Sequence, residues 1–491
     1  MKNISKILTI IFSIGVLTSC DQDLDVNTDP TTPGTITPAL AIASSEASII
    51  AITGGELANL GGFYAQYYTQ SPSAGQYDLM DQYNLPTSFG NRAWDELYSG
   101  GLNDLKYVLT EAGKTGNTGQ TLIATLLQAY TYQVLVDVFG DVPYSESLGG
   151  VANINPKADP GDQIYQDLLV KIDAALSAYN ANPVASGFGT QDVIYGGDMT
   201  NWIKFANTLK LKIYMRMAYT SLANPTAVQA LLAQNNFITS DAGFAKFGNQ
   251  ISQRNPFYEV NISSSPGLGD INHVASNTLL QFYSLNADPR LNAVFRPSNT
   301  GAYLGIDQGN GEAFTNTAVN YSRPNIGAHT PVYLMTVAES NFLQAEALIR
   351  YSGQAGAKAQ YDLGVANSFK TYGLATTSAA TLTGTGGAYE FVAGLPTEQA
   401  VRQVIVQKWA ALANVNNIEA YIETTRTKFP EVVPFGTQDY EEANRIPSRT
   451  SVQTGNIIPS ILLYPQNELD RNTSIKQRTS ITQKVWWDQK N

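Results

Sequence analysis

The sequence predicts a mainly α-helical protein with elaborate loops. Several long segments repeat apolar residues at the three- and four-residue spacing of one helix face, whereas the alternation typical of strands is scarce. Long stretches without any period separate these segments, at 70–92, 184–200, 240–330, 373–397 and 430–491. Loops of such length are usually functional or pack as irregular subdomains, so we expect the helices to carry a large loop-rich region.

The chain begins with the pattern of an export signal. Lys2 and Lys6 flank the start of an 11-residue apolar run at 7–17, and Leu-Thr-Ser-Cys ends the pattern. The run is too short to span a bilayer, which requires about 20 residues. Residues 17–20 resemble a bacterial lipobox, in which the cysteine is acylated and becomes the mature N-terminus. An ordinary signal peptide is the alternative, but Cys20 is the sole cysteine and has no disulfide partner in the chain.

A polar segment follows this signal. Residues 21–38 are rich in Pro, Thr and Asp, and we expect a flexible tether over 20–38 that begins with the acylated Cys20. Asp21, Asp23 and Asp25 alternate as in a calcium loop, but the glycine and glutamate that such a loop requires are missing. The acidic residues are more similar to the export tag of surface-displayed lipoproteins.

Five later segments have clear helical period: 121–139, 163–179, 201–219, 332–349 and 399–412. Gly140 is expected to end the first of them, and Pro143 prevents its resumption. Asp159 and Pro160 predict an N-cap and a first-turn proline for the second helix.

These helices occur in neighbouring pairs, which suggests antiparallel hairpins stacked on one another, although no fixed-period repeat is present. The best strand candidates are short, FAKFGN at 244–249 and PFYEVNI at 256–262. The length alone allows one large domain or two to three smaller ones.

Composition restricts the partners. The chain has 41 acidic and 30 basic residues, a net charge of −11, which argues against binding nucleic acid. Only 14% of residues are charged, whereas tyrosine alone contributes 27 residues. This composition favours an extracytoplasmic protein that handles neutral or weakly charged ligands. No segment after the signal approaches 18 uninterrupted apolar residues.

The motifs give little support for catalysis. The chain has two histidines, His273 and His329, both in the loop-rich middle, where we expect surface groups rather than a catalytic base. No HExxH, GxSxG or CxxC pattern occurs. A glycosidase needs only two carboxylates, but Glu339 and Glu346 are better explained as partners of arginine or as caps of a neighbouring helix. We therefore expect a protein that is not an enzyme and that holds no cofactor or metal.

Ligand binding requires aromatic rings and amides outside the core, either for the flat faces and hydroxyls of a glycan or for an oligopeptide. Six aromatic residues at helical spacing are expected to be structural: Phe63, Tyr64, Tyr67, Tyr68, Trp94 and Tyr98. No apolar period explains the loop between them, and its ligand candidates are Tyr77, Asp78, Asp81, Tyr83 and Asn84. A second loop cluster adds Arg254, Tyr258, Tyr303 and Tyr321, whereas Arg290 is expected to be structural.

Six sequence blocks together resemble the SusD/RagB family of nutrient-binding outer-membrane lipoproteins, in its SusD-like branch. In order, they are LLQAYTYQVLVDVFGDVPYSES (126–147), GDMTNWIKFANTLKLKIYMRMA (197–218), NADPRL (286–291), VYLMTVAESNFLQAEAL (332–348), VIVQKWAALANVNNIEAYIETTRTKFP (404–430), and RIPSRT with LLYPQNELDRN (445–472). Any one block is weakly specific, but their order behind a lipobox is typical of the family.

The resemblance implies a single SusD-like domain over 39–491, with about four TPR-like helix pairs and a loop-rich region packed against them. It also implies a lipid-anchored, surface-exposed location at the outer membrane. There the protein would capture an oligosaccharide, or alternatively an oligopeptide, and deliver it to a SusC-like TonB-dependent transporter. A secreted hydrolase and a helical-repeat scaffold are the competing classes. The ligand residues of the family lie in variable loops, so none is transferred to this chain by motif.

Overall fold

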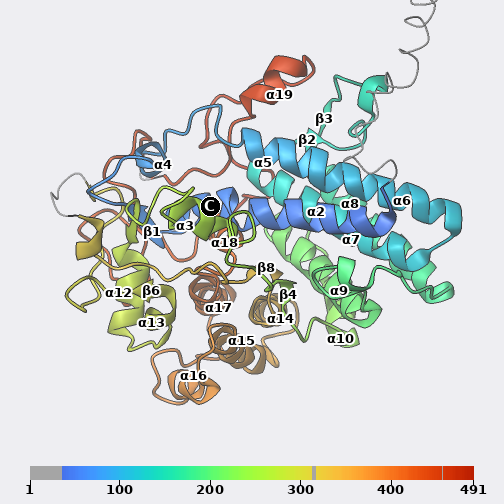
Figure 1. Ribbon diagram of the computed structural model, residues 1–491. Helices are drawn as coiled ribbons and strands as arrows, with labels where there is room; N and C mark the ends of the chain where they lie inside the picture. The colour runs from blue at the N-terminus through green and yellow to red at the C-terminus, as the bar shows by residue number, and fades with distance from the viewer. Residues whose placement is uncertain (1–35, 312–316, 456, 491) are drawn as a thin grey trace, which may run out of the picture.

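Helices form most of the regular structure in the computed structural model, which describes residues 36–311, 317–455 and 457–490 (Figure 1). Cys20 and the predicted signal and tether up to residue 35 lie outside the described residues. The first half contains α2 (Pro38–Thr53), α3 (Glu56–Tyr64), α4 (Asp78–Asp81), α5 (Asn91–Glu96), the π-helix η1 (Leu97–Leu102), α6 (Asn103–Thr115), α7 (Thr118–Phe139), α8 (Gly161–Ala181), α9 (Met199–Arg216) and α10 (Pro225–Gln234). The second half contains α11 (Pro256–Asn261), α12 (Asn277–Leu285), α13 (Arg290–Val294), α14 (Val337–Tyr351), α15 (Ala357–Thr371), α16 (Thr376–Thr383), α17 (Thr397–Ala411), α18 (Asn417–Thr427) and α19 (Gln466–Arg471).

The mainly α prediction is confirmed, and its helical layers are visible in Figure 1. Consecutive helices pack as four pairs, α6 with α7, α8 with α9, α14 with α15, and α17 with α18. The loop-rich part, with α4, α12 and α13, lies at the left of the view. At the right, α2 lies beside α6, α7 and α8, whereas α14, α15 and α17 lie at the bottom centre. The TPR-like expectation therefore describes the helical part.

Local sequence explains where the predicted helices begin and end. Asn117 caps α7 by accepting a hydrogen bond from the Gln120 amide, and Gly140 follows the helix at a φ of 72°, a conformation that favours glycine. The expected Asp159 cap of α8 is wrong. Asp159 lies in β3 and accepts hydrogen bonds from the Tyr144 and Ser145 amides, whereas the first amide of α8 donates to Asp141.

The helix predicted over 332–349 begins later than expected. Its first residues form β8 (Val332–Met335), which pairs with β4 (Ala242–Phe244). Thr336 then caps α14 by accepting a hydrogen bond from the Glu339 amide.

The strand expected over 256–262 is also wrong, because this segment forms α11. Asn255 accepts a hydrogen bond from the Tyr258 amide, and Pro256 occupies the first helical position. This N-cap and proline start a helix at a place where apolar alternation alone favoured a strand.

Within the described residues, four small antiparallel sheets join separate segments of the chain. They pair β1 (Tyr68–Gln70) with β5 (His273–Ala275), β2 (Val142–Pro143) with β3 (Ala158–Asp159), β4 with β8, and β6 (Phe295–Arg296) with β7 (Arg323–Pro324). The β1–β5 pair places the loop that follows β1 beside the chain that precedes β5.

Buried ion pairs connect the helical pairs to one another. Arg216 on α9 contacts Asp137 on α7, with 3.1 Å between Nε and Oδ2, and Glu419 on α18, with 2.8 Å between Nη2 and Oε2. Lys212 lies 3.1 Å from Glu339, and Arg426 lies 2.7 Å from Glu346. These are the ion pairs named below as the helix-core network. Glu346 thus pairs with arginine as expected, whereas Glu339 pairs with lysine.

Two helical stretches, Pro38–Tyr64 and Thr118–Phe139, are long and apolar enough to cross a membrane by length and composition alone. Most of their side chains are buried inside the fold, with 61% and 89% of the respective apolar windows covered. They are therefore explained as core helices of this protein.

Candidate functional site

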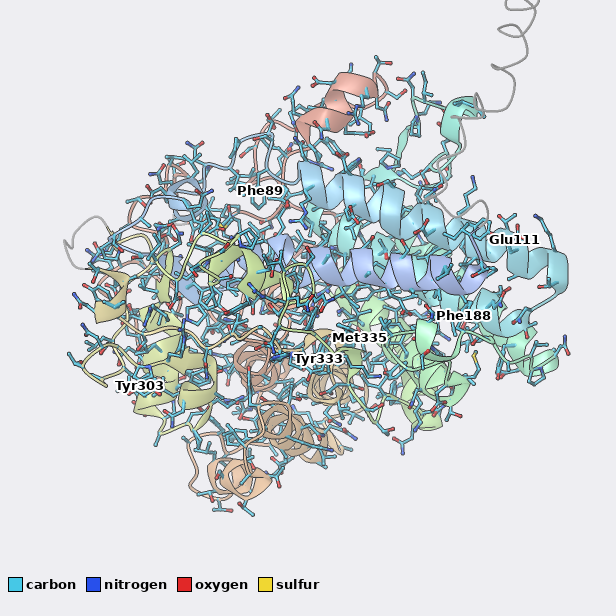
Figure 2. The ribbon with its side chains drawn as sticks, viewed as in Figure 1. Phe89, Glu111, Phe188, Tyr303, Tyr333 and Met335 are labelled. Atoms are coloured by element: carbon cyan, nitrogen blue, oxygen red, sulfur yellow. The ribbon has the colours of Figure 1, made fainter. Side chains whose placement is uncertain are left out.

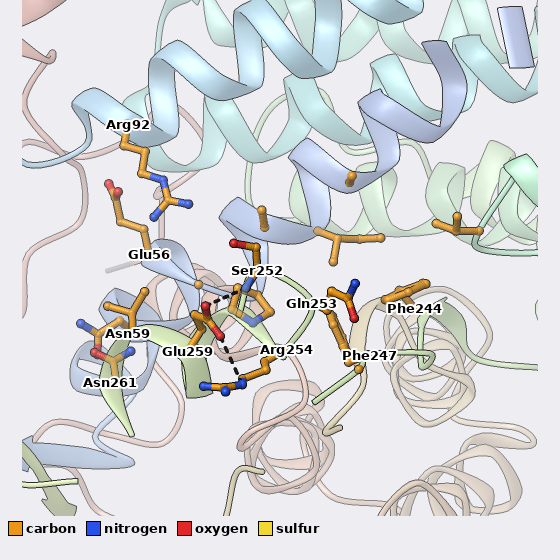
Figure 3. Close-up of a pocket in the computed structure, with 18 of the residues that line it drawn as sticks. Glu56, Asn59, Arg92, Phe244, Phe247, Ser252, Gln253, Arg254, Glu259 and Asn261 are labelled. Carbon is orange, nitrogen blue, oxygen red and sulfur yellow. Dashed lines mark hydrogen bonds and ion pairs between the residues drawn. The ribbon is translucent and has the colours of Figure 1, made fainter. Parts of the chain in front are cut away.

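A pocket of about 930 Å³ lies between α2 and α3 on one side and the segment 244–261 on the other (Figure 3). The loop 77–92, which follows β1, closes one end. The three walls of the pocket are distant in sequence, and the β1–β5 pairing helps to bring them together.

One part of the pocket is apolar. Ala43, Ala47 and Ala51 recur at four-residue spacing along α2 and present small side chains to the space. Phe244 and Phe247 face them, with ring centroids 4.7 Å apart and an angle of 89° between the rings. Small side chains opposite partly exposed rings leave a slot that accepts a flat, apolar ligand face.

The other end carries polar groups held in place by buried neighbours. The Tyr77 hydroxyl donates to Asn261 Oδ1, and burial raises the pKa of Tyr77 to about 12, so the hydroxyl stays protonated. The Tyr77 ring packs against His273, with centroids 5.0 Å apart. His273 in turn contacts Asn59 Oδ1 at 2.6 Å. The aromatic and amide groups at this end are therefore oriented before any ligand arrives.

His273 corrects the expectation of a surface histidine. It lies in β5 with 2% of its surface exposed, behind the pocket wall, and burial lowers its pKa to about 3. It is therefore neutral at physiological pH and holds Asn59 and Tyr77 in position. His329 is exposed, as expected, and contacts the Phe247 carbonyl at 2.7 Å.

Charged side chains surround the polar end of the pocket. Glu56 accepts hydrogen bonds from the Gly90 and Ala93 amides, and its Oε1 atom is buried without a hydrogen-bond partner. Burial raises the pKa of Glu56, and the positive charge of Arg92 opposes this effect. Arg254 and Glu259 form a separate pair on the opposite wall, 3.7 Å apart.

The structure places the predicted ligand residues in several different environments. Tyr77 and Arg254 both line the pocket, although they come from the two separate loop clusters. Asp78 and Asp81 line a second, polar cleft of about 350 Å³. Asp81 is buried there and accepts hydrogen bonds from Thr69 and from the Gln70 amide.

Five other predicted residues do not line the pocket, and two of these are core residues. Tyr83 is fully buried and packs edge-on against Tyr64, with centroids 5.2 Å apart. Tyr321 is 8% exposed and lies in a small apolar cluster with Val274. Protein encloses both rings, so neither faces the pocket in this conformation.

Tyr258 and Tyr303 are half-buried and pack against the main core, and Asn84 is exposed outside the pocket lining. Figure 2 shows Tyr303 at the edge of the α12–α13 region, well away from Phe89 at the pocket. The second loop cluster is therefore dispersed, and only Arg254 of its four predicted members reaches the pocket.

Several pocket residues were missed in the sequence, chiefly Glu56, Asn59, Arg92, Phe244, Phe247, Glu259 and Asn261. One signal was available for part of this set. Asn255 followed by Pro256 is a helix-start pattern, and a helix from Pro256 places Glu259 and Asn261 within the next two turns. The α2 face gave no signal, because a run of small apolar residues is equally typical of a core helix.

Replacing Asp81 by asparagine is expected to remove a pH dependence of stability. Burial raises the pKa of Asp81 to about 7, whereas the unfolded value is about 3.9. Between these values the folded state binds more protons, so the free energy of unfolding falls as pH rises, on the order of 1 kcal/mol per pH unit. Gln308 Nε2 donates to Asp81 Oδ1, and the Gln308 Oε1 atom is buried without a hydrogen-bond partner, so in Asp81→Asn a flip of the Gln308 amide lets Oε1 accept from the new amide.

The measurement compares urea midpoints of wild type and Asp81→Asn at about pH 5 and about pH 8. The stability of wild type relative to the variant should decrease with pH across this window and become constant above it. Parallel profiles for the two proteins would contradict the raised pKa. Using the difference between the two proteins cancels the titration of other groups, including His273.

No group of three or more His, Cys, Asp or Glu side chains is arranged to hold a metal ion within the described ranges.

The helical pairs, the loop-rich region and the pocket define a class of protein, a mainly α-helical fold with a pocket between its N-terminal helices and its loops. The chain belongs to the SusD-like family, whose model, described as starch-binding and associating with the outer membrane, matches residues 30–452. No curated protein matches the chain.

Solved structures share the fold. A SusD homologue from Bacteroides uniformis is 23% identical, with 93% of this chain and 100% of that chain covered and a TM-score of 0.76. A chitin-binding SusD homologue from Flavobacterium johnsoniae is 20% identical over 92% of this chain and 99% of its own, with a TM-score of 0.74. A SusD homologue from Bacteroides fragilis is 21% identical over 93% and 100% of the two chains, with a TM-score of 0.72.

Proposed function

We propose that this protein captures an oligosaccharide at the cell surface and delivers it to a SusC-like TonB-dependent transporter without chemically altering it. The observation that carries the proposal is the pocket of about 930 Å³, which combines an aromatic and alanine-lined slot with fixed amides on a family fold described as starch-binding. The chitin-binding relative from Flavobacterium johnsoniae supports a glycan as the ligand class.

The pocket chemistry suits a sugar chain. Partly exposed rings of Phe89, Phe244 and Phe247 offer flat apolar area to the C–H faces of sugar rings. Gln253 offers its exposed amide to hydroxyls, and the nearly buried Asn59 and Asn261 shape the polar end of the wall. Because Tyr77 and His273 already hold the two asparagines, little side-chain freedom is lost on binding.

Replacing Ala47 by tryptophan is expected to block the pocket. Ala47 is exposed in the middle of the α2 wall, so a large ring at this position fills the slot opposite Phe244 and Phe247 without entering the core. Isothermal titration with maltoheptaose and chitohexaose should show binding to wild type and an affinity loss of about tenfold or more in Ala47→Trp.

The matched control is Ala230→Trp on α10, which is exposed and distant from the pocket lining. It should bind as wild type does, and both variants should unfold at the wild-type temperature. Equal binding by wild type and Ala47→Trp would place the ligand elsewhere. Chromatography of the sugars after incubation should show no cleavage products, and accumulation of products would identify a hydrolase instead.

An oligopeptide remains the alternative ligand, because the same slot can accept apolar side chains. A peptide mixture titrated in parallel distinguishes the two classes. Binding of peptides that is sensitive to Ala47→Trp, with no binding of any glycan, would overturn the glycan proposal.

The proposal includes a lipid anchor at the outer membrane. In it, residues 1–19 are removed, Cys20 is acylated, residues 20–38 form a tether, and residues 39–491 form one domain. The helix α2 starts at Pro38, the residue that the proposal places at the end of the tether. Mass spectrometry of the membrane-extracted protein should find an acylated N-terminal Cys20, and co-purification with a large barrel protein tests the transporter.

A further inference from the structure

The charge balance at the pocket differs from that of the whole chain. The chain carries 41 acidic and 30 basic residues, yet the pocket lining contains the cations Arg92, Lys246 and Arg254 against only Glu56 and Glu259. The composition of the whole chain predicted a neutral or weakly charged ligand. The local excess of positive charge at the pocket instead favours a negatively charged ligand.

Arg254 and Glu259 neutralise each other. Their Nε and Oε2 atoms are 3.7 Å apart, and Glu259 also accepts a hydrogen bond from the Ser252 amide. Arg254 further donates to the Asn249 carbonyl and to the Ser263 hydroxyl, so its guanidinium is occupied in shaping this wall. This pair therefore contributes little free charge to a ligand.

Glu56 is similarly occupied. Its carboxylate is held by the Gly90 and Ala93 amides at the start of α5, and its other oxygen is buried without a hydrogen-bond partner. Burial also raises its pKa, which disfavours the charged form. Glu56 consequently offsets the charge of Arg92 only in part.

The side chains of Arg92 and Lys246 remain available to pair with an anionic group of a ligand. Among the residues that the structure describes, neither has a carboxylate within ion-pair distance, and both side chains are exposed. They come from different walls, Arg92 from α5 and Lys246 from the segment between Phe244 and Phe247. Figure 3 shows Arg92 extending toward the pocket at the Glu56 end, with Phe244 and Phe247 at the other end.

We propose that this pocket selects an acidic glycan, an oligosaccharide whose sugar faces stack on the phenylalanine rings while its carboxylate or sulfate groups pair with Arg92 and Lys246. The inference rests on the proposed function and narrows the ligand class of the same site. Charge-assisted hydrogen bonds to an anionic group are stronger than those to neutral hydroxyls, so the two cations favour anionic sugars over neutral sugars of equal length. Two partly separated cations also suit a chain that carries repeated anionic groups.

The test titrates the protein with three oligosaccharides of matched length, a galacturonate oligomer that carries carboxylates, a carrageenan oligomer that carries sulfate esters, and neutral maltoheptaose. At least one acidic oligomer should bind about tenfold more tightly than the neutral oligomer, and added salt should weaken this binding. The acidic oligomer that binds better identifies carboxylate or sulfate as the preferred group.

The double variant Arg92→Gln with Lys246→Gln should lose this preference and its salt dependence, while neutral binding changes little. The matched control, Lys157→Gln with Lys476→Gln, removes the same charge from exposed positions outside the pocket and should behave as wild type. Equal or tighter binding of the neutral oligomer by wild type would overturn this inference and leave the proposed function standing. If no oligosaccharide binds, the proposed function itself fails.

Discussion

Arg216→Met is expected to lower the free energy of unfolding by about 3–5 kcal/mol, among the largest effects of any single substitution in this chain. Arg216 is 1% exposed and contacts carboxylates on two other helices, Asp137 and Glu419, in the helix-core network. Removing one partner of a buried ion pair leaves the other charge without compensation in a medium of low polarity. Glu419 keeps Lys212 nearby, but Asp137 has no second ion pair among the described residues.

The shift of the urea midpoint measures this effect, and Lys114→Met provides the control. Lys114 pairs with Glu111 on an exposed helix face, 2.7 Å apart, so water already solvates both charges and no measurable change is expected. Adding Asp137→Asn to Arg216→Met should recover part of the lost stability, because the uncompensated charge is then absent. Indistinguishable midpoints for Arg216→Met and Lys114→Met would show that the network does not stabilise the fold.

Tyr83→Ala is expected to destabilise the fold by about 3–5 kcal/mol, the range for large aromatic side chains in cores. The ring is fully buried, and Tyr64 contacts both Tyr83 and Tyr421 edge-on at 5.2 Å, so truncation leaves a cavity within an aromatic cluster. Thermal and urea unfolding measure the loss. The affinity of the folded protein for its oligosaccharide should stay unchanged, because Tyr83 does not line the pocket.

Two further variants distinguish the packing of the Tyr83 ring from the contribution of its hydroxyl. Tyr83→Phe keeps the ring and should retain most of the stability. Tyr303→Ala removes a half-buried tyrosine at the surface and should cost clearly less than Tyr83→Ala. A stable Tyr83→Ala protein with weakened ligand binding would restore Tyr83 as a ligand residue and contradict its place in the core.

Helix period and motif order predicted the architecture well. The segments 121–139 and 163–179 became α7 and α8, and the Gly140 stop lies where expected. These errors concern places where a short local signal competed with an apolar pattern, either strand alternation or helical period. Asn255 and Pro256 start a helix inside a predicted strand. The N-cap Thr336 starts α14 only after β8, four residues or more later than predicted.

The site was much less predictable. Tyr77 and Tyr83 are six residues apart in one loop that lacks any period, yet Tyr77 lines the pocket and Tyr83 lies in the core. Neither composition nor spacing distinguishes the two, because the outcome depends on which distant segment covers each ring. Asn261 and His273 fix Tyr77, whereas Tyr64 and Tyr421 enclose the space around Tyr83.

By itself, the sequence determined the helical class, the export pattern around Cys20 and the family motifs, because each depends on neighbouring residues along the chain. Only the tertiary structure decided which side chains form the pocket and where its unpaired cations lie. Those properties arise when α2, α3 and the loops on either side of the β1–β5 pair meet. Burial and charge pairing are then set by contacts between segments that lie far apart along the chain.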